Sequence, residues 1–350
     1  MKTQMITKIG KTKALFAAVL LAVLSAGNVN AQADYATDSH LSPDVRNFLK
    51  AIHDGPGIET LSAADARKVL EGAQASVTYD YSKVTESQKT ITVDGLTISL
   101  DIMRPKGVKG DLPVFMFFHG GGWIIGDYPT HKRMVRDLVL GSGAVGVFVN
   151  YTRTPEAQYP VANNEAYAAT KWVAEHGHEI NVNGKKLAVI GNSAGGNMAA
   201  VVSLMAKEKK GPEIKTTILM WPTTAIDFTT ESFKAFGRDR FLTVKFMDKL
   251  YDLYAPDHSK RNDIHISPLL ATAEQLKGLP PTLILVAEND VLRDEGEAYG
   301  RNLLNAGVKA TTVRYNGVIH DFGLLNPLSE LPQTKDLFIQ MSAQLKEFLK

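Results

Sequence analysis

The chain of 350 residues contains no cysteine, which excludes disulfides, thiolate metal sites and a cysteine nucleophile. It also has little excess of either charge, since 39 Lys and Arg face 37 Asp and Glu. A nearly neutral protein lacks the positive field that attracts a polyanion, so nucleic acid is not an expected partner. After residue 33 no apolar run is long enough to span a bilayer, so we expect no stable membrane anchor in the mature chain.

The N-terminus has the layout of a secretory signal peptide. Four lysines and no acid occur in residues 1–13, an uncharged apolar run of 11 residues covers 14–24, and small residues follow up to Ala31 or Ala33. A helix of this apolar run covers about 16 Å, which is about half of the hydrocarbon core of a membrane. We therefore expect residues 1–33 to be removed and the protein to be exported, either periplasmic or secreted.

The rest of the chain predicts an α/β fold. Residues 34–85 are expected to form helices, one beginning after Ser42 and another capped by Ser62 and ending near Gly72. Asp94-Gly95 predicts a hairpin turn between two strands, at 90–93 and 96–103. Continuous apolar runs then indicate strands buried on both faces, as in a parallel sheet covered by helices, at 113–118, 144–150, 187–190, 216–221, 281–287 and 310–315.

One segment interrupts the alternation of strands and helices. No buried strand is expected in residues 222–265, where five of the 14 Phe fall within residues 228–246. Apolar residues at 246, 247, 250, 251 and 254 predict one buried helix face. We interpret 222–265 as an inserted helical cap, completed by residues 34–85, on a core made of 86–221 and 266–350.

A glycine-rich turn points to a nucleophile. The sequence Gly-Asn-Ser-Ala-Gly-Gly at 191–196 lies between the expected strand 187–190 and a helix from residue 197, which is the context of a nucleophile elbow around Ser193. A turn that only packs closely is the alternative. A second loop, His-Gly-Gly-Gly-Trp at 119–123, follows the strand 113–118, and its unshielded N–H groups can stabilise an oxyanion. We expect His119 to hold this loop in place.

A serine nucleophile needs a base and an acid to orient that base. His320 follows the last expected strand and Asp290 follows the strand before it, both at the strand ends where open α/β sheets place their sites. Glu288, Asp294 and Asp321 are the other acids nearby. Asp290 is favoured because it lies in the turn, whereas Asp294 is expected to complement the start of a helix. The pair His176 and His178 lacks a carboxylate cluster and predicts no metal site.

These motifs resemble the bacterial hormone-sensitive-lipase-type carboxylesterases of the α/β-hydrolase fold. The resemblance runs from about residue 42 to the C-terminus and rests on segments 119–123, 151–156, 191–196, 267–269, 287–299 and 317–323. It implies a mostly parallel sheet flanked by helices, a helical cap, and neither cofactor nor metal. It also implies that Ser193 is the nucleophile, Asp290 the acid, His320 the base, and that the N–H groups of Gly121, Gly122 and Ala194 form the oxyanion hole.

The sequence departs from that family at Asn192, where Asp is usual, and at Asp321, where Gly is usual. Both change the charge beside the triad, so the pH optimum cannot be carried over. We expect hydrolysis of a small carboxylic ester with a short acyl chain through an acyl-enzyme on Ser193. An amidase or deacetylase with the same triad, and a ligand-binding protein without turnover, are the alternatives.

Overall fold

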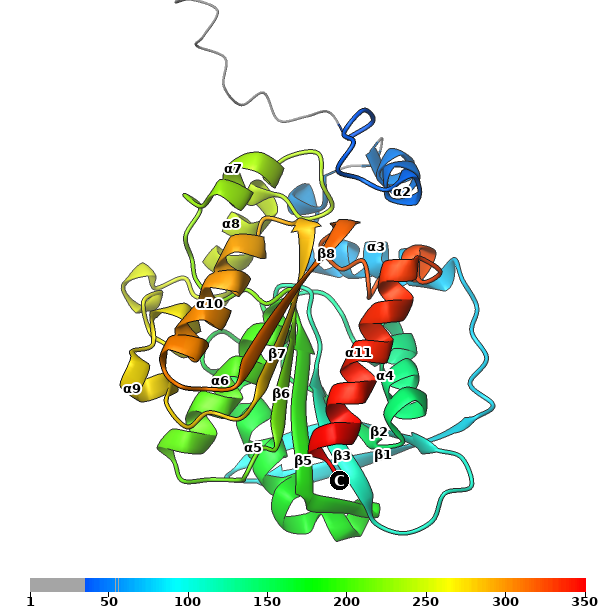
Figure 1. Cartoon of the computed structure of the whole chain (residues 1–350), viewed down its shortest axis with the longest axis vertical. Helices are drawn as coiled ribbons and strands as arrows, with labels where there is room; N and C mark the ends of the chain where they lie inside the picture. The colour runs from blue at the N-terminus through cyan, green and yellow to red at the C-terminus, as the bar shows by residue number, and fades with distance from the viewer. Residues whose placement is uncertain (1–34, 54, 56) are drawn as a thin grey trace, which may run out of the picture. The chain divides into compact units, whose positions relative to one another are not determined.

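The structure, a computed structural model, describes residues 35–350 except 54 and 56, so the expected signal peptide lies outside the described residues. A sheet of eight strands forms the centre of the described chain, in the order β1-β2-β4-β3-β5-β6-β7-β8 (Figure 1). Its strands are β1 Val84–Val93, β2 Leu96–Pro105, β3 Leu112–Phe118, β4 Val145–Asn150, β5 Val182–Asn192, β6 Thr216–Met220, β7 Thr282–Asn289 and β8 Ala310–Ile319.

The strand directions confirm the predicted fold class. β1 pairs antiparallel with β2, β2 pairs antiparallel with β4, and all pairs among β3 to β8 are parallel. Because parallel strands end at the same edge of a sheet, the turns after β3, β5, β7 and β8 meet there. The sheet thus brings together residues that are far apart in the sequence.

Helices cover both faces of the sheet (Figure 1). α4 (Tyr128–Ser142) and α11 (Pro332–Phe348) lie on one face, and α5 (Val161–His176), α6 (Ala194–Glu208) and α10 (Arg293–Asn305) lie on the other. The central strands are buried on both sides, which explains their continuous apolar sequence. Shorter elements connect these layers: η2 Gly177–Ile180, η4 Pro268–Leu270, α9 Ala273–Leu276 and η5 Asn326–Leu328.

The predicted ends of several strands were wrong. β1 begins at Val84 instead of residue 90, β5 covers Val182–Asn192 instead of 187–190, and β8 continues to Ile319 instead of 315. β1 and β8 are the edge strands of the sheet, and much of their surface is exposed. An apolar run therefore marks only the buried part of such a strand.

Two helical segments precede and interrupt this core. The first contains α2 (Pro43–His53), η1 (Ile58–Thr60) and α3 (Ala63–Ala75), and the second contains α7 (Glu231–Phe236), α8 (Val244–Tyr254) and η3 (His258–Lys260). Ser62 caps α3 by accepting a hydrogen bond from the Asp65 N–H, as expected. The predicted stop at Gly72 was wrong, because α3 continues three residues further, and a side chain at Gly72 would point into open space.

The apolar face predicted for α8 is present, since Phe246, Met247, Leu250, Tyr251 and Tyr254 are all buried. Across the described ranges 35–53, 55 and 57–350, no helix combines the length and apolar character that a membrane span requires.

Candidate active site

Ser193 lies in a strained turn between β5 and α6. Its backbone has φ 54° and ψ −121°, a conformation that non-glycine residues rarely adopt. The turn is so tight that a Cβ atom on Gly191 would clash with the carbonyl oxygen of Gly195. This explains the glycines of the motif and leaves the Ser193 side chain at the N-terminus of α6.

Ser193, His320 and Asp290 form one chain of hydrogen bonds. The Nε2 atom of His320 lies 3.0 Å from the Ser193 Oγ, and its Nδ1 atom lies 2.7 Å from the Asp290 Oδ2. The Leu292 N–H donates to the other oxygen of Asp290 at 3.0 Å. Ser193, Asp290 and His320 follow β5, β7 and β8, respectively, and these residues are 6%, 1% and 3% exposed. The structure thus brings together the three residues selected from the sequence.

The other acids near this chain bind elsewhere or approach from another side. Glu288 accepts a hydrogen bond from the Gly317 N–H and pairs with His40. Asp294 accepts from the Ser232 N–H and from Arg293. Asp321 does lie near the imidazole, but on its Nε2 side, with Oδ2 at 3.8 Å.

Two carboxylates therefore face the imidazole of His320. Burial alone lowers the pKa of His320, but the negative charges of Asp290 and Asp321 and the hydrogen bond to Asp290 outweigh burial and raise it above its ordinary value. The imidazolium form is favoured relative to a histidine in water. This suits a group that must accept a proton during a reaction.

The glycine loop after β3 faces the same cavity as the hydrogen-bonded chain. Gly121 and Gly122 line this cavity together with Ser193 and His320. Gly121 has φ 97°, and a side chain there would clash with the Ile125 carbonyl. Ala194 is the first residue of α6, where N–H groups have no partner within the helix. All three residues selected for an oxyanion hole thus lie beside the Ser193 hydroxyl or in the loop that faces it.

His119 is part of the support of this loop. Its ring stacks on Phe148 and Tyr151, with centroids 5.4 and 4.2 Å away, and its Nδ1 atom lies 2.8 Å from the Gly120 carbonyl oxygen. The Tyr151 hydroxyl donates to the His119 carbonyl at 2.8 Å. Burial lowers the pKa of His119 well below its ordinary value. The residue is therefore a neutral ring packed under the loop, as the sequence indicated.

A cavity of about 380 Å³ opens above Ser193. Its walls combine the glycine loop with residues of both helical segments, among them Phe48 and Leu70 from the first and Phe241, Phe246 and Leu250 from the second. The Phe48 and Phe241 rings are 6.2 Å apart, so the two segments meet across the cavity. Phe233 instead packs on Phe228 at 5.2 Å, which divides the Phe-rich segment between cavity wall and packing.

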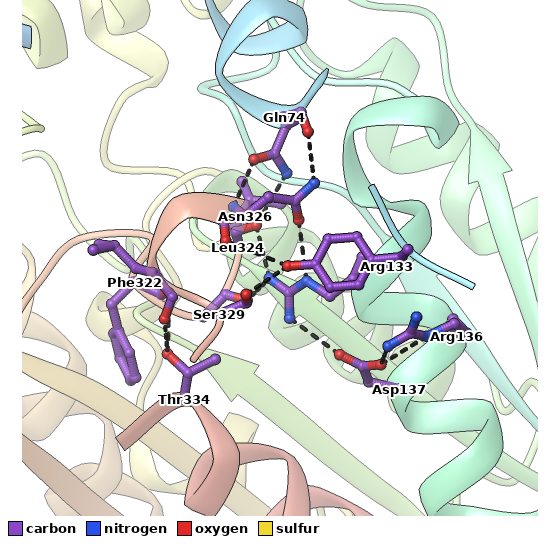
Figure 2. A network of polar contacts seen from close by, with 12 residues as sticks. Gln74, Arg133, Arg136, Asp137, Phe322, Leu324, Asn326, Ser329 and Thr334 are labelled. Carbon is purple, nitrogen blue, oxygen red and sulfur yellow. Dashed lines mark hydrogen bonds and ion pairs between the residues drawn. The ribbon is translucent and has the colours of Figure 1, made fainter. Parts of the chain in front are cut away.

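A buried polar network holds the loop that follows His320 (Figure 2). Arg133 on α4 donates to the carbonyl oxygens of Gly323 and Leu324 and to the side chain of Asn326. Gln74 on α3 donates to the Leu324 carbonyl and accepts from the Asn326 N–H at 2.9 Å. This network joins the first helical segment, the core and the loop of His320.

Sequence reasoning missed two more polar contributions to the site. The Trp221 Nε1 donates to Asp321 at 2.6 Å, although Trp221 was assigned only to a buried strand. Glu295 is 1% exposed, accepts a hydrogen bond from the Thr224 N–H at 2.7 Å, and has its pKa raised by burial to about 8. Nothing in the sequence around Glu295 indicates that this acid is buried.

The described part of the chain contains no group of three or more His, Asp or Glu side chains placed to hold a metal ion.

The chain is similar in sequence and in structure to known esterases. Residues 115–324 match the family described as having the α/β-hydrolase fold. A thermostable esterase from Pseudomonas putida is 55% identical, with a TM-score of 0.88 over 89% of this chain and 99% of that chain. Carboxylesterase NlhH from Mycobacterium tuberculosis is 32% identical over 285 residues, which cover 80% of this chain and 89% of that protein.

An ethyl acetate hydrolase from Pseudomonas putida is 27% identical over 301 residues, 83% of this chain and 94% of that protein. The family match at 115–324 covers the nucleophile turn and the residues Asp290 and His320. The chain belongs to the hormone-sensitive-lipase-type carboxylesterase family of the α/β-hydrolase fold.

Proposed function

We propose that this protein is a serine hydrolase that cleaves small carboxylic esters through an acyl-enzyme on Ser193, with His320 as the base and Asp290 as the acid. The observation that carries the proposal is the hydrogen-bonded chain from Ser193 through His320 to Asp290, at 3.0 and 2.7 Å. A protein that only binds ligands has no use for a nucleophile held in a strained turn against a buried base.

The geometry supports acyl transfer to water in two steps. The His320 Nε2 takes the Ser193 proton while Oγ bonds to the ester carbonyl carbon, and Asp290 holds the imidazole in the required orientation. The negative oxygen is stabilised by the N–H groups of Gly121, Gly122 and Ala194. Collapse breaks the bond to the alkoxy group, which receives the proton from His320 and leaves as the alcohol. A water molecule activated by His320 then releases the acid and Ser193.

The cavity favours small, apolar substrates. Its volume of about 380 Å³ lies at the lower end of the usual range of ligand pockets, about 300 to 1,000 Å³. We propose that residues 34–85 and 222–265 act as a cap over Ser193, since both contribute apolar cavity walls. The name of the relative that hydrolyses ethyl acetate agrees with a short acyl chain.

A hydrolysis screen tests this proposal. p-Nitrophenyl esters with acyl chains of increasing length, and p-nitroanilides of the same acids, would be compared at equal concentration with wild type and Ser193→Ala. We expect the highest kcat/KM for short esters and nearly complete loss in the variant. Faster cleavage of the anilides would favour an amidase, and undiminished ester cleavage by Ser193→Ala would refute the mechanism.

We also propose export through removal of residues 1–33, on the strength of the basic start and the short apolar run. N-terminal sequencing of protein expressed with its full N-terminus checks this. A start at Gln32 or Asp34 is expected, and an intact Met1 on membrane-bound material would contradict it.

A further inference from the structure

A second carboxylate, that of Asp321, reaches the imidazole from the side opposite Asp290. Asp321 is 5% exposed, and its Oδ2 lies 3.8 Å from the His320 Nε2. Its Oδ1 accepts hydrogen bonds from the Trp221 Nε1 at 2.6 Å and from the Asn192 Nδ2 at 3.1 Å. The neutral side chains of Trp221 and Asn192 thus hold this carboxylate beside the base and leave its negative charge in place.

Asn192 connects Asp321 to the glycine loop. Its side chain is buried, and its Oδ1 accepts a hydrogen bond from the Gly120 N–H at 2.9 Å, while its Nδ2 donates to Asp321. One end of the side chain must accept and the other must donate, which an amide does and a carboxylate cannot. With aspartate at both positions 192 and 321, two buried carboxylates would face each other, which is strongly unfavourable.

Within the described part of the chain, the ionisable base that pairs with Asp321 is His320. The charge of Asp321 also acts on His131 of α4. Burial nevertheless lowers the pKa of His131 to about 4, so this histidine is neutral near pH 7. Glu295 on α10 interacts electrostatically with Asp290, but the pKa of Glu295 is about 8, so Glu295 is protonated at neutral pH. Asp290 and Asp321 are therefore the two charges that act on His320.

We propose that Asp321 is a positioning residue of the reaction, which stabilises protonated His320 from its Nε2 side and, through Asn192, ties the base to the loop of Gly120. The proposal rests on the proposed function of Ser193 and His320. Asp321 acts when His320 carries the proton of Ser193, because that is when its charge has an opposite charge to stabilise. Asn192 is its necessary partner, since it supplies a donor to Asp321 and an acceptor to the loop.

Removing the charge tests the electrostatic part. Asp321→Asn keeps the size of the side chain and an acceptor for Trp221, and Asp321→Gly suits the backbone φ of 60°. Because neutral His320 is the active base, activity rises with pH through the pKa of His320, and loss of a carboxylate lowers that pKa. We expect the acid limb of the kcat/KM profile to move to lower pH in both variants, and to stay in place in the control Asp294→Asn. An unmoved limb in both variants would overturn the proposal.

A charge exchange tests the contact between the two residues. Asn192→Asp alone places two carboxylates together, so we expect a marked fall in Tm and in kcat/KM. The double variant Asn192→Asp with Asp321→Asn restores one carboxylate and one amide, and we expect it to recover a substantial part of the Tm. A double variant no more stable than Asn192→Asp would contradict the pairing.

These measurements distinguish this proposal from the proposed function. NMR titration of the His320 imidazole in wild type and Asp321→Asn reports its pKa without any turnover, and the Tm comparison needs no substrate. If wild type cleaves no ester, the proposed function fails, while a shift of the His320 titration to lower pH in Asp321→Asn would still support the contact.

Discussion

The acid that orients His320 is chosen by position in a turn. Asp290 lies 2.7 Å from the Nδ1 of His320, whereas Asp294, on the first turn of α10, binds Ser232 and Arg293. We expect Asp290→Asn to lower kcat by about 10⁴-fold, because the amide favours the wrong tautomer of the base. Asp294→Asn should cost about 1 kcal/mol of stability and leave kcat nearly unchanged.

Kinetics of the two purified variants under saturating p-nitrophenyl acetate, with Tm as the control for folding, checks this assignment. An inactive Asp294→Asn beside an active Asp290→Asn would show that the acid is placed wrongly.

Glu295 makes stability depend on pH. Its pKa is raised by burial from 4.5 to about 8, so the folded state holds a proton that the unfolded state loses above pH 4.5. Stability from this group is complete below pH 4.5 and is lost as pH rises towards 8, by an amount on the order of several kcal/mol. Glu295→Gln keeps the acceptor for the Thr224 N–H and does not titrate.

Urea unfolding at pH 5, 7 and 9 compares the two proteins. We expect wild type to lose more stability than Glu295→Gln between pH 5 and 9. Parallel curves for both would mean that Glu295 does not bind a proton on folding.

At the scale of elements, the network behind His320 depends on one buried guanidinium. Arg133 has a side chain 2% exposed and supplies donors to Gly323, Leu324 and Asn326, whereas the Arg136 side chain is 17% exposed. Arg133→Met removes these three hydrogen bonds, although Gln74 still donates to Leu324, and we expect a loss of about 3 to 5 kcal/mol in the free energy of unfolding. The matched control Arg136→Met should cost about 1 kcal/mol or less.

The loop after His320 is held by the same network, so kcat of Arg133→Met should fall at temperatures where the variant is still folded. Chemical denaturation and kcat of both variants are the measurements, and equal losses for Arg133 and Arg136 would contradict the role given to the network.

The elements also show what the sequence could predict. The turn of Ser193 and the loop of Gly121 and Gly122 are contiguous motifs, in which close packing and strained backbone demand glycine at fixed positions. Contacts between distant residues leave no such pattern. Asn192 and Asp321 are 129 residues apart, and Gln74 and Asn326 are 252 apart. These contacts depend on how the sheet and α3 are assembled. The sequence alone therefore gives no sign that Asn192 and Asp321, the two departures from the family pattern, are in contact.

For the whole molecule, the cavity between the two helical segments sets the substrate size. Phe241 lines this cavity opposite Phe48, whereas Phe233 is buried against Phe228. We expect Phe241→Ala to raise kcat/KM for longer acyl chains relative to acetate, because it enlarges the space above Ser193. Phe233→Ala should cost about 3 to 5 kcal/mol in stability without changing that ratio.

The ratio of kcat/KM for p-nitrophenyl octanoate and acetate measures this preference in each variant. An unchanged ratio in Phe241→Ala would mean that Phe241 does not limit the acyl chain.

Covalent labelling shows directly whether Ser193 carries the acyl group. Wild type and Ser193→Ala would be treated with a diethyl organophosphate, and the modified peptide would be identified by mass spectrometry. We predict one label per chain, on Ser193, formed in step with the loss of ester hydrolysis, and no label in the variant. A label on another residue, or full inhibition of wild type without modification of Ser193, would contradict it.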